Sequence, residues 1–244
     1  MKILKLYDKI MIVVIEMYVP IIPCYNPPDI LLEIIDELIK CKFNKIIIVD
    51  DGSNDKEIFQ KIKKIKECVV ITHDKNMGKG MALKSGISYY KNNLSDKYYG
   101  VVCLDCDGQH AISDMRLVGD EMVKSNNFTL GVRNFDLDGV PIRNKLGNKI
   151  TCRIFKWLFG RDIKDTQSGL RGIPNRLIDI ILNTSGDRYE YEINMLIDMV
   201  YKSETIGEVE INTIYNKKEK RYSYFKVFRD SFSIYKVMFK RCRK

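Results

Sequence analysis

The chain has 244 residues, of which 45% are hydrophobic and 30% are charged, and its formal net charge is +9. A chain of this size and composition can bury a core without disulfide or metal support, which excludes collagen-like, linker-dominated and largely disordered proteins. The positive charge is concentrated, because residues 217–244 hold eleven basic and two acidic residues while the charges of the remainder balance. We therefore expect a neutral folded domain over residues 1–216 and a basic tail over residues 217–244.

The seven cysteines are scattered and odd in number, which is typical of reduced thiols in the cytoplasm rather than of a secreted disulfide scaffold. Cys103 and Cys106 form a C-x-x-C pair, but no second pair follows at zinc-site spacing, so a redox or zinc role is not favoured. Near the N-terminus Glu16 interrupts a short apolar run, and no uninterrupted apolar stretch reaches about eighteen residues. We expect neither a signal peptide nor a transmembrane helix.

Short apolar runs alternate with amphipathic stretches of helical period over the first half of the chain. The predicted strands are residues 18–23, 45–50, 68–72, 99–105 and 128–132, and the predicted helices are residues 30–41, 56–67, 78–92 and 113–124. Continuous apolar strands joined by helices indicate an α/β fold with a mostly parallel sheet flanked by helices. In such folds ligands bind beyond the carboxyl ends of the strands, where the polar motifs of this chain fall.

After Arg133 the alternation stops. We expect a polar loop over residues 139–148, a helix over 149–159 and a glycine-containing loop over 165–172. Further helices are predicted over residues 175–182 and 190–201, and an alternating strand over 208–215. No internal repeat or linker-like stretch divides the chain, so we predict one domain with a tail.

Five aromatic residues of the tail recur at spacings of three and four, which places them on one face of an amphipathic helix. They are Phe225, Phe228, Phe232, Tyr235 and Phe239, and the basic residues beside them include Lys226, Arg229, Lys236, Lys240 and Arg241. Such a helix could pack on the core with its charges in solvent, or it could lie on an anionic membrane surface. Nucleic-acid binding is not expected, because the body carries no basic stripe.

The motif D-C-D-G-Q-H follows a predicted apolar strand directly. Alternation places the carboxylates of Asp105 and Asp107 on the same side of the extended chain. Two like charges at a strand end are tolerated when a cation compensates them, and a hard divalent ion shared with nucleotide phosphates is a common solution. The alternative is an acidic turn without a ligand.

Two further motifs fall at predicted strand ends. In I-V-D-D-G-S the carboxylate of Asp51 could accept from a base or a ribose, or the motif could only cap a helix. In N-M-G-K-G two glycines flank Lys79, so the backbone and the amine could approach a phosphate at a helix N-terminus. The spacing is not that of a Walker P-loop, and no G-x-G-x-x-G follows the first strand, which argues against a dinucleotide-dependent dehydrogenase.

The motifs together resemble those of the family 2 glycosyltransferases. The resemblance rests on I-P-C-Y-N-P-P, I-V-D-D-G-S, N-M-G-K-G-M-A-L, L-D-C-D-G-Q-H and G-V-R-N in this order. The later stretches V-P-I-R-N-K-L-G-N, D-T-Q-S-G-L-R-G-I-P and Y-E-Y-E-I-N-M-L are similar to the branch that contains dolichyl-phosphate mannosyltransferases and bacterial polyprenyl-phosphate glycosyltransferases. The resemblance covers about residues 18–215 and implies a GT-A fold, a nucleoside-diphosphate sugar donor, Mg²⁺ or Mn²⁺, and inversion at the anomeric carbon.

The resemblance also implies roles for individual residues. On the donor side it places Pro23, Tyr25 and Asn26 beside the nucleoside, Asp51 as an acceptor for the base, Lys79 near the donor, and Asp105, Asp107 and Gln109 at the metal and the diphosphate. On the acceptor side Arg133 and Arg143 match positions that meet the acceptor phosphate in members that use a lipid phosphate.

The acceptor decides which further group is needed. A phosphate monoester has a second pKa of about 6 and is largely ionised at neutral pH, so it needs positioning by arginine more than a general base. A sugar hydroxyl would need a base, and Asp165 in D-T-Q-S-G is the candidate, with a capping carboxylate as the alternative. Glu190 and Glu192 are candidates for the acceptor side or for solvated helix residues. His110 could join the metal site, but a structural donor is the favoured interpretation, and His73 and Trp157 are expected as packing residues.

The leading hypothesis is transfer of a hexose from a UDP- or GDP-linked donor to a polyprenyl phosphate, by an enzyme bound peripherally to the cytoplasmic face of the membrane through its tail. An alternative enzyme would transfer to a sugar hydroxyl in cell-surface polysaccharide or glycan synthesis. A non-catalytic scaffold whose tail binds membrane or RNA is a third alternative. The scaffold is disfavoured, because without a ligand nothing would compensate the Asp105 and Asp107 carboxylates.

Overall fold

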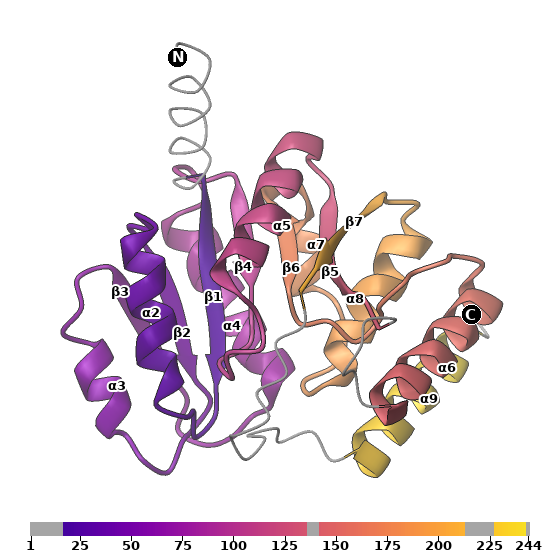
Figure 1. Cartoon of the computed structure of the whole chain (residues 1–244), viewed down its shortest axis with the longest axis horizontal. Coiled ribbons are helices and arrows are strands. Elements are labelled where there is room, and N and C mark those ends of the chain that lie inside the picture. Colours follow the sequence, from indigo (N-terminus) through magenta and orange to yellow (C-terminus); the bar gives the residue numbers. More distant parts are fainter. Residues whose placement is uncertain (1–16, 136–141, 213–226, 243–244) are drawn as a thin grey trace.

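The computed structural model describes residues 17–135, 142–212 and 227–242 (Figure 1). These residues form a seven-stranded sheet in the order β3-β2-β1-β4-β6-β5-β7. The strands are β1 (Tyr18–Cys24), β2 (Ile46–Asp50), β3 (Cys68–Thr72), β4 (Gly100–Cys103), β5 (Phe128–Arg133), β6 (Arg171–Pro174) and β7 (Ile206–Ile211). Strands β3, β2, β1 and β4 pair in parallel, as the alternating pattern predicted.

Helices cover both faces of the sheet. They are α2 (Ile30–Lys40), α3 (Glu57–Ile62), α4 (Lys79–Asn93), α5 (Ile112–Ser125), α6 (Ile142–Phe159), α7 (Ile178–Leu182), α8 (Glu190–Tyr201) and α9 (Val227–Cys242), with a short 3-10 turn at Asn175–Leu177. Alternate residues of β1 face opposite sides, so Ile22 packs with α2 and α5 while Ile21 packs with α4 and α8. The predicted α/β layering is therefore confirmed.

Strand β6 is the main departure from the sequence expectation. Residues 165–172 were predicted as a loop, but Arg171 and Gly172 belong to β6, which pairs antiparallel with both β4 and β5. The segment R-G-I-P contains a glycine and a proline, which are unfavourable in strands, so its local sequence gives little strand signal. Burial between two neighbours makes it a strand, since all four of its residues are buried.

Helix α6 begins earlier than predicted, at Ile142 rather than at residue 149, so most of the expected polar loop is helical. Polar side chains of this helix are used in packing. Asn148 donates from Nδ2 to the Lys164 carbonyl at 3.0 Å, and the Thr151 hydroxyl contacts the Tyr235 hydroxyl at 3.0 Å. Strand β7 likewise begins at Ile206 instead of residue 208, and residues 213–215 of the predicted strand lie outside the described residues.

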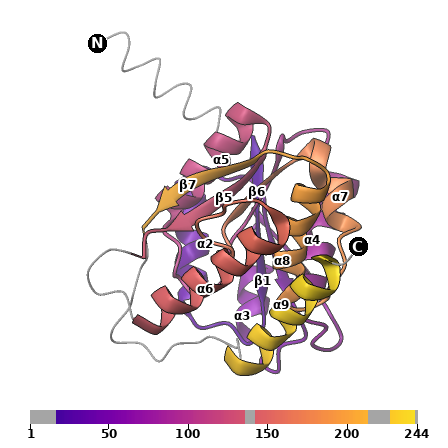
Figure 2. The same cartoon turned by 90° about the vertical axis from the view of Figure 1, so that its right-hand side faces the viewer.

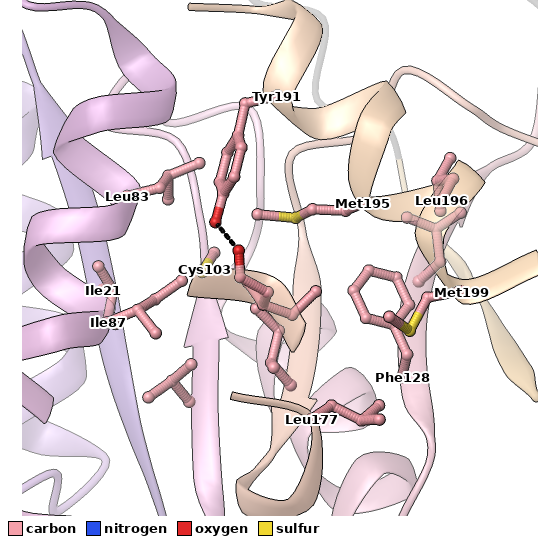
Figure 3. Packing of buried hydrophobic residues seen from close by; sticks show 14 of the residues in the cluster. Ile21, Leu83, Ile87, Cys103, Phe128, Leu177, Tyr191, Met195, Leu196 and Met199 are labelled. Atoms are coloured by element: carbon pink, nitrogen blue, oxygen red, sulfur yellow. Dashed lines mark hydrogen bonds between the residues drawn. The ribbon is translucent and has the colours of Figure 1, made fainter. Parts of the chain in front are cut away.

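The larger core cluster lies between the sheet and helices α4, α7 and α8 (Figure 3). Tyr191 of α8 is fully buried there and donates its hydroxyl to the Ile181 carbonyl at 2.7 Å. A Cβ added to Gly80 of α4 would come within 2.6 Å of the Tyr191 Cβ, so this glycine allows α4 and α8 to approach closely. Cys103 also lies in this cluster, where burial raises the pKa of its thiol to about 12, which disfavours metal binding or redox chemistry there.

Helix α9 lies beside α6 at one end of the molecule (Figures 1 and 2). Among the α9 side chains that the structure describes, Ile234 and Met238 are buried in the core cluster and Tyr235 packs against it, so the aromatic face is only partly turned to the core. Phe232 and Phe239 are 69% and 43% exposed. Phe225, the side chain of Phe228 and the predicted boundary between residues 216 and 217 lie outside the described residues.

Trp157 was predicted as a packing residue, but it is 76% exposed on α6 and meets Phe239 edge to face, with 6.4 Å between the ring centroids. Within the described part of the chain, no helix combines the length and the apolar character that a membrane span requires.

Candidate functional site

The carboxyl ends of β2, β1 and β4 lie side by side, because the three strands are parallel neighbours. Asn26 follows β1 with a left-handed backbone (φ 43°), its amide donates to the Ser53 hydroxyl at 2.8 Å, and its side-chain oxygen accepts from the Asn54 amide at 2.8 Å. These bonds join the turn after β1 to the turn after β2. Pro23 is buried within β1 and Tyr25 is half-buried just beyond it, so the structure brings the three predicted nucleoside contacts to this edge.

Asp51 anchors the loop that leads into α4. Its carboxylate is 2% exposed and accepts from the amides of Met77 and Gly78 and from the His73 ring, each at 2.8 Å. A carboxylate offers about four acceptor directions, so these three bonds leave room for one more donor. His73 also contacts the Ser85 hydroxyl at 2.9 Å, and it is therefore a polar link rather than a packing residue. Its position one residue beyond the predicted third strand was a signal for this role.

Lys79 is the first residue of α4 and lies between two carboxylates. Its Nζ is 2.7 Å from Asp105 Oδ1 and 2.9 Å from Glu192 Oε2. Burial disfavours the charge of Lys79, but the carboxylates of Asp105 and Glu192 outweigh burial and raise the pKa of Lys79 above its ordinary value. Burial also opposes ionisation of Asp105, yet Lys79 and His110 hold the pKa of Asp105 well below its usual range. Lys79 and Asp105 therefore form a charged pair.

Asp107 lies in a different electrostatic environment. Burial and the neighbouring charge of Asp105 raise the pKa of Asp107 above its ordinary value, so the site disfavours a second negative charge. The Gln109 amide donates to Asp107 Oδ1 at 3.1 Å and fixes the carboxylate beside the turn. The structure therefore places the three predicted metal-site residues together after β4.

The donor set of this turn fits a hard divalent cation. The two carboxylates and the side-chain carboxamide of Gln109 can supply the oxygen ligands that Mg²⁺ and Mn²⁺ prefer. A cation that binds there would relieve the repulsion between Asp105 and Asp107. Among the described residues, no three His, Cys, Asp or Glu side chains come together as a metal cluster. Further oxygens, such as those of a diphosphate, would therefore be needed to complete the coordination.

Two residues that the sequence interpretation did not single out shape the surroundings of Asp105. A Cβ added to Gly169 would come within 2.4 Å of Asp105 Oδ2, so a glycine is needed where this loop meets the carboxylate. Arg171 is 1% exposed; its Nε donates to the Ser168 carbonyl at 2.9 Å and its Nη1 donates to the Glu192 carbonyl. Arg171 thus joins the D-T-Q-S-G loop to α8. It belongs to β6, which had little sequence signal.

Glu190 and Glu192 have separate structural roles. Glu190 accepts from the Asp187 and Arg188 amides at 3.1 and 3.2 Å and fixes the turn that precedes α8. Glu192 has a side chain that is 12% exposed and is the second partner of Lys79. Neither is a solvated helix residue. His110 Nε2 lies 3.7 Å from Asp105 Oδ2, which is beyond ordinary hydrogen-bond length.

A second charged pair lies at the end of β5. Asp165 is fully buried and binds the Arg133 guanidinium through two bonds, from Nε at 2.6 Å and from Nη2 at 3.1 Å. The amides of Gln167 and Arg133 add bonds at 3.0 and 3.3 Å. Asp165 begins the loop that contains Gly169, and Gly169 packs against Asp105, so this loop links the two carboxylates. Arg143 lies in the first turn of α6, and its side chain lies outside the described residues.

The arrangement combines complementary binding functions at one edge of the sheet. A pair of carboxylates with an amine can hold a cation and an anion together. The Arg133 guanidinium, fixed at the Asp165 end of the linking loop, can orient a second anion. The site is therefore suited to bring two phosphorylated molecules together.

Comparisons with known proteins agree with this description. The family model described as Glycosyl transferase family 2 matches residues 21–176. An uncharacterized protein of Methanocaldococcus jannaschii is 31% identical over 81% of this chain and 81% of its own length. The UDP-N-acetylglucosamine–dolichyl-phosphate N-acetylglucosaminyltransferase of Methanococcus voltae is 30% identical over 81% of this chain and 85% of its own length.

Solved structures confirm the predicted GT-A fold. The glucosyl-3-phosphoglycerate synthase of Mycobacterium tuberculosis, crystallised with Mn²⁺ and UDP, superposes with a TM-score of 0.68 at 15% identity. The superposition covers 96% of this chain and 83% of that protein. The resemblance expected from the motifs is confirmed as well.

Proposed function

Because the chain belongs to glycosyl transferase family 2, we propose that it is a metal-dependent, inverting enzyme that transfers a hexose from a UDP- or GDP-linked donor to a polyprenyl phosphate at a membrane surface. The observation that carries the proposal is that the loop from Asp165 to Gly169 links two charged pairs, Asp105–Lys79 and Arg133–Asp165. One pair suits a diphosphate with its ion, and the other suits a phosphate acceptor.

The residues proposed to bind the nucleotide-sugar donor lie beyond the carboxyl ends of the parallel strands. Pro23, Tyr25 and Asn26 border the nucleoside, and the remaining acceptor direction of Asp51 is available to an N–H of the base. Asp105, Asp107 and Gln109 would hold Mg²⁺ or Mn²⁺. When bound, such an ion stabilises the negative charge that develops on the departing nucleoside diphosphate.

The acceptor half favours a phosphate over a hydroxyl. The bidentate bond to Asp165 fixes the plane of the Arg133 guanidinium, which remains 19% exposed and can meet an ionised phosphate. Asp165 itself accepts four hydrogen bonds from Arg133 and Gln167, so it has little capacity to take a proton from a hydroxyl. Transfer to a sugar hydroxyl would require a different base.

The surface made by α6 and α9 suits peripheral binding to a membrane. Its exposed large side chains, which we call the apolar ridge, are Leu146, Ile150, Trp157, Phe232 and Phe239. They share one face of each helix, and the contact between Trp157 and Phe239 joins the two faces. Exposed basic residues such as Lys156, Lys236 and Lys240 lie near the ridge and would be attracted to anionic lipid. The Phe232 and Phe239 of the predicted tail therefore act together with α6.

The proposed reaction is tested with purified protein, Mn²⁺ and a panel of UDP and GDP sugars. The matched acceptors are a short polyprenyl phosphate and the polyprenol of the same length. We expect a lipid-linked sugar phosphate to form from one nucleotide sugar with the phosphate acceptor and none with the alcohol. Equal transfer to the alcohol or to a saccharide would favour the polysaccharide or glycan alternative, and release of no sugar from any donor would contradict the proposal.

A further inference from the structure

The Lys79 amine binds one of the two carboxylate oxygens of Asp105. Its Nζ lies 2.7 Å from Asp105 Oδ1, and the Lys79 side chain is 18% exposed. The other oxygen, Oδ2, faces Gly169, where even a Cβ would come within 2.4 Å. An ion that binds Asp105 must therefore share the carboxylate with Lys79 or displace the amine from it.

The position of Lys79 on its helix is unfavourable without these carboxylates. Lys79 begins α4, and a positive charge at a helix N-terminus opposes the helix dipole. The close approach of Gly80 to Tyr191 brings the start of α4 against α8 and sets Lys79 opposite Glu192. The amine is thus held by contacts that the tertiary structure supplies.

Glu192 gives Lys79 a second place to bind. Glu192 Oε2 lies 2.9 Å from the Lys79 amine, and Glu192 Oε1 lies 3.9 Å from Nε of the buried Arg171. Arg171 also donates to the Glu192 carbonyl, so this residue is anchored independently of Lys79. The amine can therefore leave Asp105 and remain bound to Glu192.

We propose that Lys79 is an internal counter-cation of Asp105. When the metal ion binds, the Lys79 amine leaves Asp105, remains on Glu192 and gains the donor diphosphate as a partner. The proposal rests on the metal site of the proposed function and adds an order to it. The ion alone meets a like charge and binds weakly. A nucleoside diphosphate offers Lys79 new negative partners, so the ion and the nucleotide each strengthen the binding of the other, as linkage requires.

Binding of Mn²⁺ to the full chain, followed by electron paramagnetic resonance of the free ion, tests this order without turnover. Lys79→Met is expected to bind Mn²⁺ alone about tenfold tighter than wild type, and to lose most of the gain that UDP or GDP gives, a coupling of ordinary size. This is a gain of binding, which a damaged fold would not produce. Glu192→Gln is expected to weaken binding of Mn²⁺ alone several-fold, about threefold to fivefold, because Lys79 then has Asp105 as its remaining carboxylate.

The matched control is Lys84→Met. Lys84 lies on the same helix with a side chain that is 19% exposed, and its Nζ contacts the Gly186 carbonyl at 2.8 Å and Asp187 at 3.4 Å. We expect Lys84→Met to bind Mn²⁺ like wild type. Equal or weaker binding of Mn²⁺ by Lys79→Met would overturn the role of Lys79, and unchanged binding by Glu192→Gln would overturn the role of Glu192.

Asp105→Asn separates this proposal from the proposed metal site. If wild type binds Mn²⁺ with UDP or GDP and Asp105→Asn does not, the metal site stands whatever Lys79→Met shows. If neither wild type nor Lys79→Met binds Mn²⁺ with either nucleotide, the metal site and the counter-cation role are both overturned.

Discussion

Asp105 and Asp165 are linked by the loop from Asp165 to Gly169, and both are paired with a basic residue, but the two pairs are built differently. Asp165 is fully buried, and the planar Arg133 guanidinium and two backbone amides hold it from four sides. The Asp105 side chain is 29% exposed and meets one amine, which has a second carboxylate within reach. A bidentate guanidinium pair is rigid, whereas an amine on a flexible stem can change partners. The comparison indicates that Asp165 fixes structure, and it agrees with our proposal that Asp105 exchanges Lys79 for a metal ion. We call Asp105, Asp107 and Lys79 the exchanging site.

The largest effect is expected from Asp107→Asn, which removes a carboxylate from the exchanging site. Transfer should fall about a thousandfold, because the charge stabilisation that a metal ion supplies amounts to several kcal/mol. The fold should persist, since Asp107 has no bidentate partner. Initial rates at matched Mn²⁺ concentration, with circular dichroism of the same samples, measure both effects. Wild-type turnover in this variant would remove Asp107 from the metal site.

Asp165→Asn and Asp105→Asn form a matched pair that addresses stability. Asp165→Asn should lower the free energy of unfolding by about 3 kcal/mol, because it leaves the largely buried Arg133 guanidinium without its carboxylate. Asp105→Asn should cost clearly less, since Lys79 keeps Glu192. Urea unfolding of the two variants gives both numbers. Equal losses would mean that Asp105 is as structural as Asp165, and the comparison would fail.

Trp157→Ser combined with Phe232→Ser examines the apolar ridge without disturbing the core, because both side chains are mostly exposed. We expect binding to anionic vesicles to weaken about tenfold, which corresponds to about 1.4 kcal/mol of lost apolar and interfacial contact. Co-sedimentation at low and high salt measures the binding, which salt should weaken by screening. Leu117→Ser is the control, since Leu117 is 51% exposed on α5, outside the ridge. Equal losses in both proteins would contradict a specific membrane surface.

The smallest expected effect is the pH dependence of stability in Asp107→Asn. The folded protein raises the pKa of Asp107 through burial and through Asp105, so ionised Asp107 destabilises the metal-free fold at neutral pH. Asp107→Asn should therefore be slightly more stable than wild type at pH 7. The difference should shrink as the pH falls through the raised pKa of Asp107, because wild type then carries a neutral side chain there. Thermal unfolding across this range, with chelator present, checks the sign, and a difference that grows towards acid would be inconsistent with it.

The exchanging site could be predicted largely from the sequence. Its residues follow apolar strands that are clear locally, and the parallel order places the strand ends together, so Lys79, Asp105 and Asp107 were identified from their motifs. Glu192 was identified only as one of two candidates for the acceptor side. Its partner Lys79 lies 113 positions earlier in the chain (192 − 79), so no local pattern joins the two residues. Helix periodicity does not determine which distant residue a helix faces.

The Arg133–Asp165 pair shows why the other parts of the site and the fold could not be predicted from the sequence. Arg133 and Asp165 were assigned separate roles, because a contact across 32 residues has no local signal. Strand β6 and the start of α6 were also missed. Both contain glycine and polar residues that are typical of loops, and β6 gains its structure from buried neighbours. In this part of the chain tertiary packing outweighs local propensity.

The central claim is that Asp105 exchanges its partner while Asp165 keeps its own. The most direct test is a crystal structure of the protein with Mn²⁺ and the nucleoside diphosphate that the protein binds. The account predicts that the ion contacts Asp105 and Asp107, that the Lys79 amine lies on Glu192 and the diphosphate, and that the Arg133–Asp165 pair keeps both of its hydrogen bonds. An ion bound elsewhere with Lys79 still on Asp105, or an opened Arg133–Asp165 pair beside an unchanged Asp105–Lys79 pair, would contradict it.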